Sequence, residues 1–125
     1  MSGKVLLVDD SGLARRSTRR ALEQAGYDVL EAEDGLSALE RFAIDKPDVV
    51  LLDLVMKGMY GLDVLEKLRQ LDPAARVIVM SADIQTSSRE MVQAAGAAAF
   101  INKPAPAGAV VEMVERVLAG SAPWS

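Results

Sequence analysis

Val49-Val50-Leu51-Leu52-Asp53 is an apolar run that ends on a carboxylate. Four successive apolar residues indicate a strand that is buried on both faces, as in a parallel sheet covered by helices. The aspartate that ends the run must then lie at the exit of the strand. Taken alone, Asp53 fits a residue that opens a turn or caps a helix equally well. Its role therefore depends on what the rest of the chain brings to the same edge.

The composition indicates one domain and narrows the available chemistry. The chain has 125 residues, of which 50% are hydrophobic and 26% charged, as is typical of a globular domain with one core. It has no cysteine and no histidine, which excludes disulfides, thiolate or imidazole metal sites and histidine acid–base chemistry. A net charge of -4 disfavours direct binding of nucleic acid by this domain. We therefore expect chemistry based on carboxylates, hydroxyls and amines.

Neither a membrane span nor a signal peptide is predicted. No apolar run approaches the roughly 18 residues that a membrane span needs. The N-terminus leads from Met1 straight into a short strand. We expect a cytoplasmic protein with one domain over residues 1–120 and a loose tail over residues 121–125.

Strand and helix signals alternate along the chain. Strands are expected at residues 5–8, 27–31, 48–52, 76–80 and 99–101, and helical apolar spacing follows at about 11–25, 36–43, 62–71, 84–95 and 106–119. Five strand–helix units predict an α/β fold, a doubly wound (βα)5 flavodoxin-like sandwich. Its parallel five-stranded sheet would have the strand order 2-1-3-4-5.

Polar residues follow four of these strands at the same end. In a doubly wound sheet, ligands bind beyond the carboxyl ends of the strands, where the strand order reverses. Asp9 and Asp10 follow the first strand, Asp53 the third, Ser81 the fourth and Lys103 the fifth. The rim of the sheet would therefore collect three carboxylates, a hydroxyl and an ammonium group.

Three carboxylates in one pocket repel each other. Two of them ~4 Å apart repel by roughly 4 kcal/mol at an effective dielectric near 20, so the pocket needs raised pKa values or a cation. Because imidazole and thiolate ligands are absent, the oxygen donors favour Mg²⁺. A carboxylate can also attack a phosphoryl group to form an aspartyl phosphate, with Lys103 and Ser81 holding the remaining phosphoryl oxygens.

Together these residues resemble the receiver domain of two-component response regulators, of the CheY-like kind. The motifs that carry the resemblance, each after the matching strand, are Asp9-Asp10, Asp53, Ser81-Ala82 and Lys103-Pro104. The resemblance covers Lys4 to about Ala119. It implies a signalling protein, not an enzyme, in which Asp53 accepts a phosphoryl group from a phosphohistidine of a sensor histidine kinase.

The resemblance also implies roles for the other residues of the rim. Asp10 and Asp53 would ligate Mg²⁺ directly, together with the backbone carbonyl of Val55, and Asp9 would act mainly through water. Ser81, Ala82 and Lys103 would bind the phosphoryl group.

Two further residues occupy positions with a role in the family. Phe100 is at the position of the switch aromatic, which turns inward when Ser81 moves toward the phosphate. Pro104 would follow a cis peptide bond.

The chain departs from the family pattern after Asp53. Lys57 replaces the usual proline, while Met56, Met59 and Gly61 fit the pattern. The loop therefore loses a fixed φ angle, which affects its rigidity and not phosphorylation. Val55 and Asp83 also line the rim and would tune the site. Because an apolar Val55 cannot orient a hydrolytic water, we expect it to promote little self-dephosphorylation.

Two surfaces are candidates for contacts with partners. Arg15, Arg16, Arg19 and Arg20 form a basic patch on the first helix, which could dock a kinase or an acidic partner. The simpler interpretation is a solvated face on which Arg19 pairs with Glu23. In the family, the fourth helix, fifth strand and fifth helix carry output. That output would reach a downstream effector protein or a further domain that this chain lacks.

Three alternatives remain at this point. A magnesium-dependent phosphatase of the haloacid dehalogenase kind also uses a strand-end aspartate, but after its first strand, and with a second aspartate two residues on. A flavodoxin-like cofactor binder needs a hydroxyl- and glycine-rich loop where this chain has Asp9 and Asp10. The third alternative is a receiver-like module that binds partners without being phosphorylated.

Overall fold

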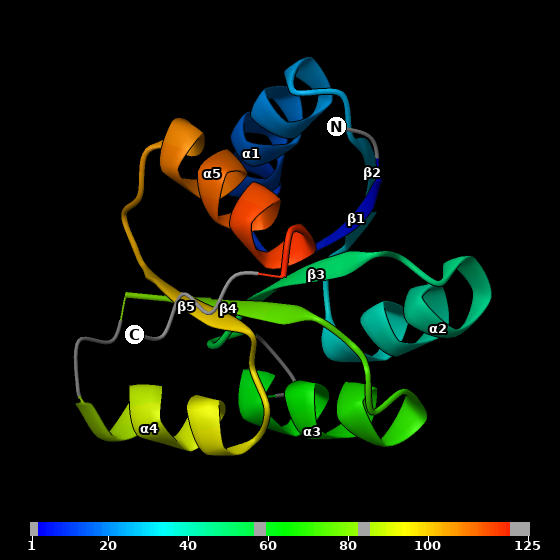
Figure 1. Cartoon of the computed structure of the whole chain (residues 1–125), viewed down its shortest axis with the longest axis vertical. Helices are drawn as coiled ribbons and strands as arrows, with labels where there is room; N and C mark the ends of the chain where they lie inside the picture. The colour runs from blue at the N-terminus through cyan, green and yellow to red at the C-terminus, as the bar shows by residue number, and fades with distance from the viewer. Residues whose placement is uncertain (1–2, 57–59, 83–85, 121–125) are drawn as a thin grey trace.

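Strands and helices alternate along the chain in the computed structural model, which describes residues 3–56, 60–82 and 86–120 (Figure 1). The strands are β1 (Lys4–Val8), β2 (Asp28–Ala32), β3 (Val49–Asp53), β4 (Val77–Ser81) and β5 (Ala99–Asn102). The helices are α1 (Gly12–Gln24), α2 (Gly35–Asp45), α3 (Gly61–Leu71), α4 (Thr86–Ala94) and α5 (Ala107–Leu118). The predicted (βα)5 alternation is confirmed.

The strands form one parallel sheet in the order β2-β1-β3-β4-β5, as predicted. Figure 1 shows α1 and α5 on one face of the sheet and α2, α3 and α4 on the other. The strand order reverses between β1 and β3, which are direct neighbours. The carboxyl ends of these two strands therefore form the crevice at which such sheets bind ligands.

The core has two halves, one on each face of β3. Val50 and Leu52 pack into the half covered by α2, α3 and α4, and Val49 and Leu51 pack into the half covered by α1 and α5. All four side chains are at most 1% exposed. Burial of each stabilises the fold by about 1.5–3 kcal/mol. The strand that ends on Asp53 is thus held firmly on both faces.

The observed strands and helices differ from the predicted ones mainly at their ends. β2, β3 and β4 each begin and end one residue later than predicted, so that Asp53 and Ser81 are the last residues of their strands. Leu13 and Leu36, which helped to place two helices, are 77% and 64% exposed. Polar caps begin these helices instead: Ser11 and Asp34 each accept a hydrogen bond from the backbone N–H three residues on, at 3.2 and 2.8 Å.

The C-terminal boundary follows α5. This helix ends at Leu118, and Gly120 adopts a φ of +85°. The expected tail, residues 121–125, lies outside the described residues, so the division of the chain at residue 120 stays a prediction. Among the described residues, no helix is long and apolar enough to cross a membrane.

Candidate functional site

Two adjacent strands bring three carboxylates together at the carboxyl end of the sheet. Val8 pairs with Leu52 in the register of β1 and β3, so the aspartates that follow these residues emerge side by side. One carboxylate oxygen from each of Asp9, Asp10 and Asp53 lies within 4.8 Å of the others. Asp9 and Asp53 are buried, whereas Asp10 is exposed. We call these three residues the acidic pocket.

Lys103 follows β5, the edge strand of the sheet, and its side chain extends across the carboxyl ends of the strands to the acidic pocket. Its Nζ lies 3.3 Å from Asp9 Oδ2 and 3.3 Å from Asp53 Oδ2. The Lys103 backbone N–H donates to the Ser81 carbonyl at 2.8 Å, which ties the end of β5 to the end of β4. The Lys103-Pro104 peptide bond is cis, as predicted. One ammonium group thus bridges the two buried carboxylates.

Backbone N–H groups hold the second oxygen of each buried carboxylate. Ser11 donates to Asp9 Oδ1 at 2.9 Å, and Val55 donates to Asp53 Oδ1 at 3.2 Å. Each carboxylate is therefore oriented from two sides, by a backbone amide and by Lys103. Its rotamer is restricted before any ligand arrives.

Burial sets the protonation behaviour of the site. Desolvation raises the pKa of the Asp53 carboxyl above its ordinary value, although the nearby Lys103 opposes the change. Desolvation also disfavours the ammonium form of Lys103, but Asp53 and Asp9 outweigh it, and the pKa of Lys103 is raised. The cation thus stays charged, while Asp53 carries a charge that its surroundings only partly compensate.

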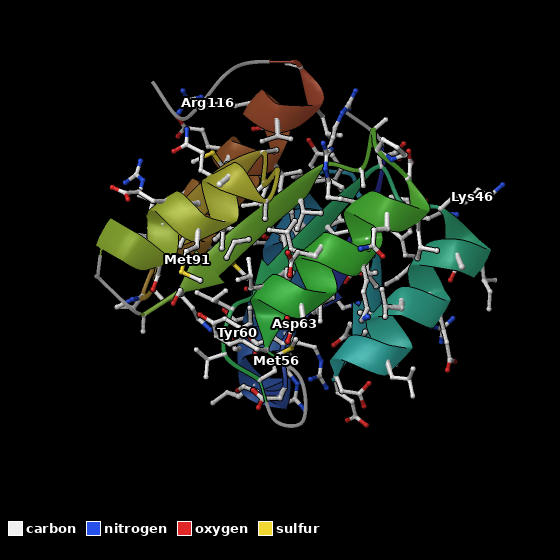
Figure 2. The ribbon with its side chains drawn as sticks, turned by 90° about the horizontal axis from the view of Figure 1, so that it is seen from below. Lys46, Met56, Tyr60, Asp63, Met91 and Arg116 are labelled. Carbon is white, nitrogen blue, oxygen red and sulfur yellow. The ribbon has the colours of Figure 1, made fainter. Side chains whose placement is uncertain are left out.

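Position 61 requires glycine because the backbone there lies close to the backbone of Asp53 and Leu54. The Gly61 N–H donates to the Leu54 carbonyl at 2.8 Å. A Cβ at position 61 would lie 2.6 Å from both the Asp53 carbonyl oxygen and Leu54 Cα. Only glycine fits this contact. Figure 2 shows Met56, Tyr60 and Asp63 at the same end of α3, on either side of this glycine in the sequence. Gly61 thus lets the chain return to β3 directly beneath the pocket.

The remaining predicted site residues surround this arrangement. Ser81 ends β4 and is buried, and Ala82 after it is exposed. Phe100 in β5 is half-buried and packs against the core half under α2, α3 and α4. Val55 beside the pocket is 62% exposed. Lys57 and Asp83, and also Met59, lie outside the described residues.

The basic patch on α1 is only partly the solvated face that its sequence suggests. Arg19 pairs with Glu23 at 3.2 Å, as expected. Arg15 and Arg19 also converge on Glu31 of β2, at 2.9 and 2.5 Å. The hydrogen bond from Arg19, joined by that from Arg15, lowers the pKa of Glu31 against the effect of burial. Glu31 was not among the predicted site residues, although a carboxylate inside a strand near an arginine-rich helix is a recognisable signal.

Comparisons with known proteins agree with this geometry. The response regulator receiver domain family matches residues 5–115. Chemotaxis protein CheY of Thermotoga maritima is 37% identical over 118 residues, which are 94% of this chain and 98% of that protein. Chemotaxis protein CheY of Bacillus subtilis is 36% identical, over 94% of this chain and 99% of that protein.

A solved structure supports the same assignment. The CheY-like response regulator receiver domain protein from Methanospirillum hungatei JF-1 superposes with a TM-score of 0.91, at 27% identity and with 96% of each chain covered. The fold, the family match and the relatives agree over nearly the whole chain. This chain therefore belongs to the response regulator receiver domain family and serves as a phosphorelay receiver.

Proposed function

We propose that Asp53 is the phosphoryl acceptor of this receiver, and that it takes the group from a phosphohistidine of a sensor histidine kinase in the cytoplasm. The observation that carries this assignment is the position of Asp53 at the end of the central strand. Asp9 and Asp10 flank it from β1, and Ser81 and Lys103 flank it from β4 and β5. Asp53 thus has groups for a phosphoryl ligand on both sides, which supports it as the acceptor among the carboxylates that the structure describes.

The donor set of the acidic pocket fits Mg²⁺. Asp10 and Asp53 would hold the ion together with the Val55 carbonyl, and Asp9 would act through water. The oxygen atoms available are hard donors, and the chain has no cysteine or histidine to favour a softer metal. When bound, Mg²⁺ neutralises the negative charge of the phosphoryl oxygens.

The residues of the chain supply the rest of the chemistry. The Asp53 carboxylate attacks phosphorus, so that an oxygen–phosphorus bond forms while the donor's nitrogen–phosphorus bond breaks and the imidazole leaves with the bonding electron pair. The Lys103 ammonium, already 3.3 Å from Asp53 Oδ2, would bind a phosphoryl oxygen, and Ser81 and Ala82 would bind others. Acting as an acceptor in this way, the domain is a signalling protein without substrate turnover.

Ser81 and Phe100 would transmit the effect of phosphorylation from Asp53 to the surface of the domain. Ser81 ends β4 and is 1% exposed, and its hydroxyl would move toward a phosphoryl group on Asp53. Phe100 is half-buried and could move further inward behind it. Because Phe100 lacks a hydroxyl, only apolar burial would bias its two rotamers. The surface of α4, β5 and α5 would then be recognised by a downstream effector or an output domain.

Three residues that follow Asp53 or Ser81 closely in the sequence would tune the lifetime of the phosphoryl group. Val55 is exposed beside Asp53 and offers no polar atom from its side chain. Lys57 follows Val55 by two residues in the sequence, and Asp83 follows Ser81 by two residues. We assign them to tuning by their sequence positions alone.

The proposal is tested by chemical phosphorylation. The protein is incubated with phosphoramidate, with and without Mg²⁺, and its intact mass is measured. We expect a phosphoryl increment that requires Mg²⁺ and is absent in Asp53→Asn. Asp48→Asn is the matched control, because it removes a carboxylate from the opposite end of the sheet. A Mg²⁺-dependent increment that persists in Asp53→Asn overturns the assignment, and no increment in any variant would favour the unphosphorylated interaction module.

A further inference from the structure

Arg15 links the acidic pocket to a carboxylate outside it. Its Nε donates to Glu31 Oε1 at 2.9 Å, and its Nη1 donates to the backbone carbonyl of Asp9. The side chain is only 16% exposed. α1 and β2, which carry Arg15 and Glu31, lie side by side (Figure 1). One guanidinium thus spans from β2 to the loop that carries two of the three acidic residues.

The carbonyl that Arg15 holds belongs to the peptide joining Asp9 to Asp10. This peptide unit is planar, so fixing its oxygen also fixes the direction in which the chain enters Asp10. The same loop is held by the Asp9 N–H, which donates to the Ala32 carbonyl at 3.1 Å, and by the Ser11 N–H on Asp9 Oδ1. Those two bonds orient Asp9. Arg15 reaches the peptide that leads to Asp10, the exposed member of the pocket.

Glu31 sets the direction of this contact. Arg19, one turn further along α1, occupies the other oxygen of Glu31 at 2.5 Å and also pairs with Glu23 at 3.2 Å. Arg15 and Arg19 thus bind different oxygens of Glu31, and the fork of Arg15 is directed by its own bond to Oε1. A planar fork can bind a carboxylate with one nitrogen and a carbonyl with another, which the single ammonium of lysine cannot do in the same orientation.

We propose that Arg15 is a positioning residue for the acidic pocket: directed by Glu31, it fixes the Asp9–Asp10 peptide so that the carboxylates are arranged before a divalent cation binds. The inference rests on the proposed function, because it takes the pocket to be a cation site. Residues that orient metal ligands from outside the ligand set typically change metal affinity by 10- to 100-fold when mutated.

Charge and positioning predict opposite effects, which makes the inference testable. Arg15 carries a positive charge close to the pocket, so if it acted only through its field, its removal would strengthen the binding of a cation. If it positions the loop, its removal weakens binding although the repulsion is gone. Arg19 is the matched control, since it has the same charge and the same partner, Glu31, but the structure gives it no bond to Asp9.

The test is a titration of Mg²⁺ into the full chain, followed by backbone amide NMR shifts or by calorimetry. We expect Arg15→Gln to weaken Mg²⁺ binding about tenfold, while Arg19→Gln leaves it unchanged or slightly tighter. Arg15→Lys retains charge and packing, so it remains informative if Arg15→Gln folds poorly. It too is expected to bind Mg²⁺ more weakly.

Two results would overturn the inference while leaving the proposed function intact. One is Mg²⁺ binding by Arg15→Gln and Arg15→Lys as tight as that of the unaltered protein. The other is an equal loss of affinity in Arg19→Gln. If the unaltered protein itself binds no Mg²⁺, both the cation site of the proposed function and the role of Arg15 are wrong.

Discussion

Charged side chains have different surroundings at the two ends of the sheet. At the amino ends of the strands, Asp48 accepts a hydrogen bond from the Lys4 backbone N–H at 2.7 Å, and the Lys4 ammonium donates to the Asp45 carbonyl at 3.2 Å. These two contacts join residues far apart in the sequence, and they are exposed and part-buried, respectively. At the carboxyl ends, Asp9 and Asp53 are buried and share the ammonium of Lys103.

The contacts at the amino end serve stability, whereas those at the carboxyl end serve function. The amino end joins neighbouring strands and loops by pairwise contacts. At the carboxyl end, burial raises the pKa of Asp53, and the neighbouring Asp9 adds to the effect. A buried carboxyl group with a shifted pKa is typical of sites that bind ligands. Matched substitutions at the two ends test whether they differ in this way.

The largest expected effect is that of Lys103→Met. The variant removes the cation that bridges Asp9 and Asp53 and the group that would bind a phosphoryl oxygen. We expect the rate of phosphorylation by phosphoramidate to fall by about 10²- to 10³-fold, the usual effect of losing one such group. Lys4→Met, which removes the lysine at the amino end, should leave the rate unchanged. Equal rates in the two variants would contradict the distinction between the ends.

Gly61→Ala is expected to have the next largest effect. The added Cβ would lie 2.6 Å from the Asp53 carbonyl oxygen, and the backbone under the pocket must move. We expect the free energy of unfolding to fall by about 2 kcal/mol in urea titrations. Gly108→Ala in α5 is the control, because a Cβ there meets nothing within 4 Å. It should be slightly stabilising. A neutral Gly61→Ala would show that the close approach is not required.

Asp53→Asn should stabilise the protein in the absence of divalent cations. Because burial raises the folded pKa of Asp53, its contribution to stability is fully present below the unfolded pKa, near 4, and is lost as pH rises through the folded value. Replacing it with asparagine should therefore increase the free energy of unfolding by about 1 kcal/mol at neutral pH. The gain should shrink as pH falls toward 4.

Asp48→Asn provides the comparison for Asp53→Asn. Asp48 accepts the Lys4 N–H, so this variant should be neutral or slightly destabilising. Urea titrations of both variants at several pH values, with a chelator present, measure the effect. A destabilised Asp53→Asn at neutral pH would mean that Lys103 fully compensates the charge of the carboxyl end.

The smallest effect concerns Val55. An asparagine at this exposed position could orient a water toward a phosphoryl group on Asp53, whereas valine cannot. We expect Val55→Asn to lose its phosphoryl group several times faster than the unaltered protein, as followed by intact mass after removal of the donor. Ile44→Asn changes an equally apolar, 75% exposed residue on α2 and should have no effect. No acceleration in Val55→Asn counts against a tuning role.

Much of the fold could be predicted from sequence because its strands are short apolar runs between helices. The β3 run predicted a strand with both faces buried, and Val49 to Leu52 are indeed divided between the two halves of the core. The predicted helix starts, at about residues 11 and 36, lie within one residue of the observed starts at Gly12 and Gly35. Side-chain caps and not burial of Leu13 and Leu36 define these starts, and the apolar spacing alone does not show that.

The site was predictable where residues follow strands directly. Asp9 and Asp53 lie beside each other because β1 and β3 are neighbours, and Lys103 joins them from β5. The family match also decides against the phosphatase and the flavodoxin-like alternatives. Contacts that depend on tertiary approach could not be predicted, as with the bond from Arg15 to Asp9. A sequence pattern gives neither the reach of a side chain nor the distance between backbones.

The most direct test of the account is to locate the phosphoryl group on the chain. After phosphorylation in Mg²⁺, an acyl phosphate can be reduced with borohydride, which converts the modified aspartate to homoserine, and the position is then read by peptide mass spectrometry. We expect homoserine at position 53 alone. Reduction at Asp9 or Asp10, or modification of a side chain at the amino end of the sheet, would contradict it.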